Sequence, residues 1–183
     1  HLGLIPSYED PQAQNKIINI RNAVNEQIDI DQIIDIAQLG SSLSAPILSF
    51  KTTAKPQFSG LRIGIAQDRA FGFYYSGDLD AIRETGASLI AIDTLEDKYL
   101  PDIDGLFIGG GFPERHANAL QKNVSLRQMI KSAIEAGLPT YAECGGMMYL
   151  SEQLSWQNSS YNMVGAIPGR TTMHEKPCGR GYV

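Results

Sequence analysis

Cysteine is scarce in this chain of 183 residues, which contains only Cys144 and Cys178. Two cysteines in unlike local sequences are too few for a disulfide framework, so we do not expect a small disulfide-stabilised secreted domain. A reducing cytoplasm is the compartment that this cysteine content favours. Each thiol therefore has to be judged by its own surroundings.

An excess of basic residues is also lacking. The chain has 15 Lys and Arg against 20 Asp and Glu, a formal net charge of −5 and a pI of about 5.1. Nucleic-acid-binding domains usually carry a basic patch or stripe, so nucleic acid is not an expected partner. No apolar run approaches the roughly 18 residues that a membrane-spanning helix needs, and the first residues do not resemble a signal peptide. We therefore expect no membrane partner and a cytoplasmic location.

The known phosphate-binding motifs are missing as well. The glycine run Gly109–Gly111 fits neither GxGxxG before a helix nor GxxxxGK[ST], so it is not predicted to bind a nucleotide. No internal repeat or low-complexity tract is present. We expect no cofactor and no metal site within this chain.

Two regions of different pattern are present. In residues 1–56, apolar side chains at helical spacing predict one helix, and Asp31 is the predicted N-cap of a second helix that ends near Gly40. The helical face of residues 1–40 is expected to be exposed or paired with another copy, which leaves a homodimer open. Residues 41–60 have the composition of a linker. The predicted domains are residues 1–56 and 57–183.

From Leu61 onwards, short apolar runs alternate with helical patterns. Strands are predicted at Leu61–Ala66, Ser88–Ile92, Gly105–Ile108 and Thr140–Glu143, and helices are predicted to end at Gly86 and Gly137. This alternation predicts an α/β domain with a mostly parallel sheet and helices on both faces. Ligands of such sheets bind at the carboxyl ends of the strands, where two glycine-rich segments lie.

The first of these segments contains Cys144, between Ala142 and the pair Gly145 and Gly146. A strand that turns sharply into a helix places the turn residue in an unusual backbone conformation, which small neighbours permit. The dipole of the following helix and a nearby histidine would favour the nucleophilic thiolate. The N–H of Gly145 would face an oxyanion formed during attack on a carboxamide. An isolated cysteine is more often a buried apolar residue, but these flanking residues favour a nucleophile.

The second segment is Gly109–Gly111, where the absence of side chains lets backbone N–H groups approach a ligand. Gly-Gly-Gly-Phe-Pro-Glu at Gly109–Glu114, followed by Ala142–Leu150, is similar to the glutaminase domain of the cobyrinic acid a,c-diamide synthase family. That family belongs to the cobyrinate and cobyric acid branch of class I glutamine amidotransferases. The segments Phe71–Tyr75, Gly165–Arg170 and His1–Pro6 also resemble it.

The resemblance implies a flavodoxin-like glutamine amidotransferase domain over residues 57–183, incomplete at its C-terminal end. Residues 1–56 would be the end of an ATP-binding synthetase domain with a linker. Cys144 would be the nucleophile, and Gly145 with Gly110 or Gly111 would donate the oxyanion-hole N–H groups. Ammonia from glutamine would amidate the a and c carboxylates of cobyrinate, a corrinoid, with ATP and Mg²⁺ bound outside this chain. Ala142 departs from many class I glutaminases, which have glycine there.

A cysteine glutaminase also needs a base to activate the thiol and protonate the leaving ammonia. The chain offers His1, His116 and His174, but the resemblance places the catalytic histidine after the segment matching Arg180–Val183. We therefore expect this chain by itself to turn over glutamine negligibly.

Other interpretations stay open at this stage. The same chemistry could serve cobyric acid or another tetrapyrrole as acceptor. The chain could also be a non-catalytic flavodoxin-like module with a vestigial cysteine, or a cysteine hydrolase or redox sensor on the same fold.

Overall fold

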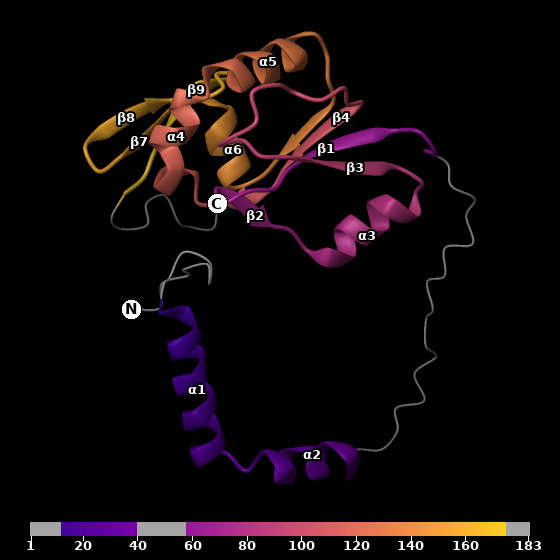
Figure 1. Cartoon of the computed structure of the whole chain (residues 1–183), viewed down its shortest axis with the longest axis vertical. Coiled ribbons are helices and arrows are strands. Elements are labelled where there is room, and N and C mark those ends of the chain that lie inside the picture. Colours follow the sequence, from indigo (N-terminus) through magenta and orange to yellow (C-terminus); the bar gives the residue numbers. More distant parts are fainter. Residues whose placement is uncertain (1–11, 40–57, 175–183) are drawn as a thin grey trace, which may run out of the picture. The chain divides into compact units, whose positions relative to one another are not determined.

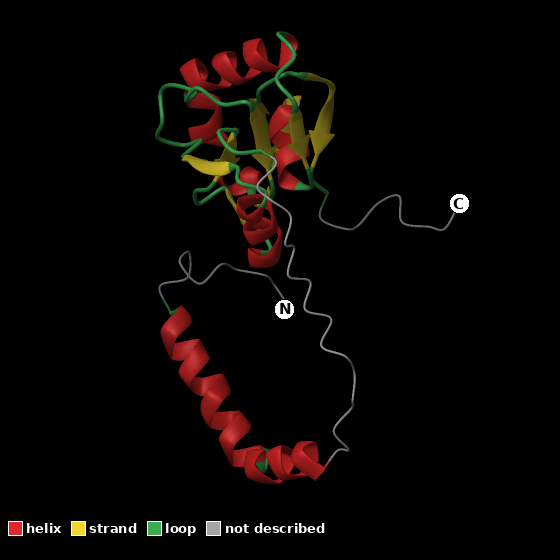
Figure 2. Ribbon diagram, turned by 90° about the vertical axis from the view of Figure 1, so that its right-hand side faces the viewer, coloured by secondary structure: helices red, strands yellow, loops and turns green. Residues whose placement is uncertain are grey.

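The structure, a computed structural model, describes residues 12–39 and 58–174, which fall in two compact units. Their helices and strands are shown in Figure 1 and Figure 2. The predicted boundary at residues 56 and 57 lies outside the described residues, so it stays a prediction. His1–Pro6, Gly40, Cys178 and Arg180–Val183 also lie outside them.

The first unit contains two helices, α1 (Ala13–Gln27) and α2 (Ile30–Leu39), and neither has a buried residue. The prediction that Asp31 is the N-cap of α2 is wrong, because the helix begins one residue earlier. Asp29 takes that role: its Oδ1 accepts a hydrogen bond from the Gln32 N–H at 2.9 Å. Asp31 lies in the first turn, where its charge still interacts favourably with the helix dipole.

The second unit is built on a parallel sheet with the strand order β3-β1-β4-β6. The strands are β1 (Arg62–Ala66), β3 (Ser88–Ile92), β4 (Gly105–Ile108) and β6 (Thr140–Ala142), and every pair in this sheet is parallel. The helices are α3 (Ser76–Glu84), η1 (Pro113–His116), α4 (Ala117–Lys122), α5 (Val124–Glu135) and α6 (Gly145–Leu150). The predicted α/β class with a mostly parallel sheet is confirmed.

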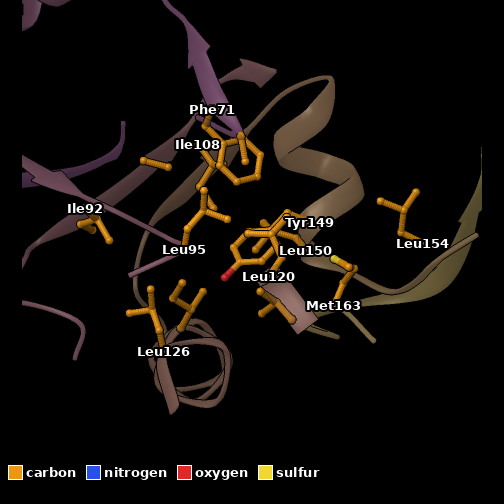
Figure 3. Close-up of a cluster of buried hydrophobic side chains, with 14 of the residues drawn as sticks. Phe71, Ile92, Leu95, Ile108, Leu120, Leu126, Tyr149, Leu150, Leu154 and Met163 are labelled. Carbon is orange, nitrogen blue, oxygen red and sulfur yellow. The ribbon is translucent and has the colours of Figure 1, made fainter. Parts of the chain in front are cut away.

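Helices lie on both faces of this sheet, with α3 on one side and α4, α5 and α6 on the other (Figure 1). The main core lies on the second side, where Leu106 and Ile108 of β4 pack with Leu120, Leu126 and Tyr149 of the three helices (Figure 3). Successive residues of a strand point to opposite faces, so both faces need apolar side chains. This explains the short continuous apolar runs in the sequence.

Two helices end where glycine was predicted to stop them. Gly86 and Gly137 have φ of 93° and 99°, a left-handed conformation that glycine adopts without steric cost. After α5, the N–H of Gly137 donates to the carbonyl of Ile134, and the N–H of Leu138 donates to the carbonyl of Ala133, both at 2.9 Å. These bonds satisfy carbonyl groups that the helix leaves without partners.

Two smaller sheets were not predicted. The strand β2 (Phe71–Phe73) pairs antiparallel with β5 (Gly110–Gly111). A three-stranded sheet has the order β8-β7-β9, formed by β7 (Ser151–Trp156), β8 (Ser159–Asn162) and β9 (Ile167–Thr172). These strands are rich in Ser, Gln, Thr and Asn, and β5 is a pair of glycines. Such residues give no apolar alternation that could predict a strand.

The turn between β7 and β8 gives a testable prediction about stability. Gln157 and Asn158 have φ of 48° and 62°, as a two-residue hairpin turn requires, but glutamine adopts this conformation at a cost. We expect Gln157→Gly to raise the free energy of unfolding by about 0.5–1 kcal/mol. Gln128→Gly, the same exchange on the exposed side of α5, should lower it by about 1 kcal/mol. Thermal unfolding of both variants checks this prediction. An equal loss of unfolding free energy in the two variants would contradict it.

Candidate active site

Cys144 lies at the turn between β6 and α6, with φ of 48° and ψ of −114°. This sparsely populated conformation costs a residue other than glycine about 1–3 kcal/mol. Backbone hydrogen bonds maintain the turn: the Glu143 N–H donates to the Ile108 carbonyl at 3.1 Å, and the Gly146 N–H donates to the Glu143 carbonyl at 2.8 Å. The thiol of Cys144 is free, and the residue is exposed. The turn therefore presents the thiol at the carboxyl end of the sheet.

The glycines after Cys144 allow the backbone at the start of α6 to approach the backbone at the end of β4 closely. A Cβ on Gly146 would lie 2.3 Å from the carbonyl oxygen of Ile108, and one on Gly145 would lie 2.9 Å from Cδ of Pro113. Real Cβ atoms are not found at such distances, so larger residues would force the start of α6 away from the sheet. The first turn of α6 thus packs directly against the segment that follows β4.

That segment is the glycine loop, Gly109–Gly111. A Cβ on Gly111 would lie 1.9 Å from the carbonyl oxygen of Ala70, and a Cβ on Gly110 would lie 3.7 Å from Cβ of Cys144. On the other side, a Cβ on Gly145 would lie 3.0 Å from the carbonyl oxygen of Gly111. Because β4 and β6 are neighbours, the four predicted site residues Cys144, Gly110, Gly111 and Gly145 meet in one place. Their chemical roles stay predictions.

Tyr74 connects the glycine loop to the neighbouring strand β1. Its hydroxyl accepts a hydrogen bond from the Gly109 N–H at 2.9 Å and donates one to the carbonyl of Ala66. Its ring meets the ring of Phe107 edge to face, with centroids 5.2 Å apart. Burial raises the pKa of Tyr74 to about 12, against a smaller opposing effect of the bond from Gly109. The hydroxyl is therefore neutral at physiological pH and can both donate and accept.

Asp68 organises the loop between β1 and β2. Its Oδ1 accepts hydrogen bonds from the N–H groups of Ala70 at 2.6 Å and Phe71 at 3.0 Å. Its Oδ2 accepts from the N–H and the hydroxyl of Thr94, both at 2.6 Å. These bonds hold Ala70 against Gly111, so Asp68 supports the glycine loop from behind. Neither Tyr74 nor Asp68 was predicted as a site residue, although an Asp that bonds the backbone two residues on is a known turn pattern.

An apolar groove of about 730 Å³ lies beside α3 and extends to the residue before Cys144. Two of its lining residues, Asp78 and Glu143, are acidic. The Tyr141 hydroxyl donates a hydrogen bond to Oε2 of Glu143 at 3.1 Å. This bond, followed by the charge of Glu143, raises the pKa of Tyr141. The part of the groove lining nearest Cys144 in the sequence therefore combines an aromatic ring with a carboxylate.

The described histidines occupy different positions. His116 ends the 3-10 turn η1 directly after the glycine loop and is partly buried, and His174 is exposed at the end of the described residues. Within residues 12–39 and 58–174, no group of three or more His, Cys, Asp or Glu is placed to hold a metal ion. In the same ranges, no helix is long and apolar enough to cross a membrane.

Comparisons with known proteins agree with this arrangement. The model of the CobB/CobQ-like glutamine amidotransferase domain matches residues 62–183. A cobyrinate a,c-diamide synthase of Magnetococcus marinus is 38% identical to this chain, and one of Listeria monocytogenes serotype 4b is 42% identical. A third, from Archaeoglobus fulgidus, is 39% identical. Each alignment covers 100% of this chain but only 39–40% of the relative, so the chain spans about two fifths of the length of these relatives. The resemblance found in the sequence is thereby confirmed.

Proposed function

The chain belongs to the CobB/CobQ-like glutamine amidotransferase domain family, and on that premise we propose that it releases ammonia from glutamine for an amidoligase. The single observation that carries the proposal is that the four predicted site residues, Cys144, Gly110, Gly111 and Gly145, meet where β4 and β6 end. A Cβ on Gly110 would lie 3.7 Å from Cβ of Cys144, and one on Gly145 would lie 3.0 Å from the carbonyl oxygen of Gly111. A strained, exposed thiol stands there beside residues, Gly110 and Gly145, that have no side chain of their own. This is the arrangement that attack on a carboxamide requires.

In the proposed mechanism, the thiolate of Cys144 attacks the side-chain carbonyl carbon of glutamine. The electron pair of the carbonyl moves to its oxygen, and the resulting oxyanion accepts hydrogen bonds from the N–H of Gly145 and from that of Gly110 or Gly111. The histidine that took the thiol proton gives it to the nitrogen of the intermediate as the C–N bond breaks, so ammonia departs and a thioester remains on Cys144. Water then attacks the thioester, which releases glutamate and restores the thiol.

The fate of the ammonia follows from the family. Because the relatives are named cobyrinate a,c-diamide synthase, we propose that the ammonia amidates the a and c carboxylates of cobyrinate. ATP and Mg²⁺ would activate these carboxylates on residues outside this chain. A cytoplasmic location suits the free thiol. A cobyric acid or another tetrapyrrole acceptor would use the same glutaminase chemistry.

The test uses 6-diazo-5-oxo-norleucine, a glutamine analogue that alkylates the nucleophile of glutaminases. It is applied to this chain and to the extended chain, which we define as this chain lengthened past Val183 by the sequence that follows the matching segment in the Listeria monocytogenes relative. Mass spectrometry should find the adduct on Cys144 in the extended chain, and a weaker adduct or none in the 183-residue chain, where the histidine of the family is not expected.

Iodoacetamide, which alkylates any reactive thiol, is the control reagent. Iodoacetamide could label Cys144 in both polypeptides while the glutamine analogue forms no adduct in either. That result would refute the proposed glutaminase activity. The non-catalytic module or the redox sensor would then be favoured. Easy oxidation of Cys144 would select the redox sensor between these two.

A further inference from the structure

The hydroxyl of Tyr74 lies at the centre of a short chain of contacts that leads to Cys144. The Gly109 N–H donates to this hydroxyl at 2.9 Å, and the Gly109 carbonyl accepts from the Gly146 N–H at 3.1 Å. Gly109 is thus held at both of its polar groups, on one side by Tyr74 and on the other by the helix that begins after Cys144. The next residue, Gly110, lies beside Cys144: a Cβ on it would lie 3.7 Å from Cβ of Cys144.

The ring of Tyr74 is fitted to the same glycine. A Cβ on Gly109 would lie 2.6 Å from Cε1 of Tyr74 and 3.0 Å from the carbonyl oxygen of Phe73. The ring therefore fills the space that a side chain at Gly109 would take, and Phe107 supports it edge to face. The packing of the ring fixes the position of the Tyr74 hydroxyl. The hydrogen bonds to the N–H and the carbonyl of Gly109 fix the orientation of its peptide groups.

We propose that Tyr74 is a positioning residue for glutamine hydrolysis, whose hydroxyl holds Gly109 so that the Gly110 and Gly111 backbone is aligned with the thiol of Cys144. This inference rests on the proposed function, since it concerns the oxyanion formed at that site. Small displacements of such a donor matter, because removal of one oxyanion-hole donor lowers kcat by about 10²–10³. Tyr74 does not touch the substrate in this proposal and acts through the glycine loop.

Tyr74→Phe is the variant that tests this, because it removes the hydroxyl and keeps the ring that packs on Gly109 and Phe107. The Gly109 N–H then loses its partner, at a cost of about 1–3 kcal/mol. This is smaller than the stability of about 5–15 kcal/mol that domains usually have, so the variant should fold. Tyr99→Phe is the matched control, since it deletes the same atom from a side chain that is 75% exposed.

The rates are measured in the extended chain. Tyr74→Phe should lower the rate of Cys144 labelling by 6-diazo-5-oxo-norleucine, and kcat for glutamine, by about tenfold or more. The KM should change little, because the lost alignment concerns the transition state. Labelling by iodoacetamide should stay within about twofold, because it needs a reactive thiol and no oxyanion hole. Amide exchange of Gly109 should become faster, and Tyr99→Phe should match the unmodified protein in every measurement.

Three outcomes would overturn the inference. If Tyr74→Phe labels with the glutamine analogue as fast as the unmodified protein, the hydroxyl does not position the loop, and the proposed function stands. If labelling by both reagents falls equally, the substitution has disturbed the thiol itself and the specific role is wrong. If the unmodified protein reacts with iodoacetamide but never with the glutamine analogue, the proposed function fails and the inference fails with it.

Discussion

Cys144→Ala is expected to abolish glutamine hydrolysis and labelling by the glutamine analogue in the extended chain, with a loss of about three orders of magnitude or more. The reason is that no other atom of the site can form the thioester: its neighbours Gly110 and Gly145 have no side chains. Ammonia release and mass spectrometry of the labelled protein measure the effect. Cys178→Ala is the control, because it removes the other thiol of the chain and should leave both measurements unchanged.

A second substitution at the same position separates chemistry from stability. Cys144 has a φ of 48°, a conformation that glycine adopts freely. Cys144→Gly should therefore be as inactive as Cys144→Ala but more stable than the unmodified protein by about 1 kcal/mol. Ammonia release from either variant at the rate of the unmodified protein would refute the assignment of the nucleophile. A lower melting temperature of Cys144→Gly would contradict the strain argument.

The parallel sheet could be predicted from the sequence because apolar side chains lie on both of its faces. A strand such as β1, which lies between α3 and the helices on the other side, is apolar from Ile63 to Ala66, and that signal does not depend on distant residues. The helix ends at Gly86 and Gly137 were also predictable, since few residues other than glycine adopt their φ. The smaller sheets were not predictable, because polar side chains in β7, β8 and β9 carry no such signal.

The candidate site was predictable in part for a similar reason. Cys144, Gly145 and Gly146 are consecutive in the sequence, so their pattern can be recognised directly. The alternation of strands and helices indicated that the glycine loop would lie beside them. The contacts of Tyr74 and Asp68 connect residues that are far apart in the sequence. The bond between Tyr74 and Gly109 spans 35 residues, and that between Asp68 and Thr94 spans 26. No local pattern specifies such pairs, so they required the structure.

Gly111→Ala is also expected to have a large effect, because it should lower both the stability and the activity of the protein. The added Cβ would lie 1.9 Å from the carbonyl oxygen of Ala70 and 2.8 Å from its carbonyl carbon. These are backbone atoms, held in place by the bonds that Asp68 makes to the N–H groups of Ala70 and Phe71, so no rotation of a side chain can relieve the contact. We expect the free energy of unfolding to fall by about 3 kcal/mol or more.

The displaced loop should also carry the predicted oxyanion donors away from Cys144, and labelling by the glutamine analogue should fall by about a hundredfold. Gly77→Ala is the matched control: a Cβ there meets nothing within 4 Å. Because Gly77 lies in α3, that exchange should stabilise the helix by about 0.5–1 kcal/mol. Denaturant unfolding and labelling rates decide between the two. If Gly111→Ala unfolds and labels like the unmodified protein, the loop tolerates a side chain, and the close contact of Gly111 with Ala70 does not hold the oxyanion donors in place.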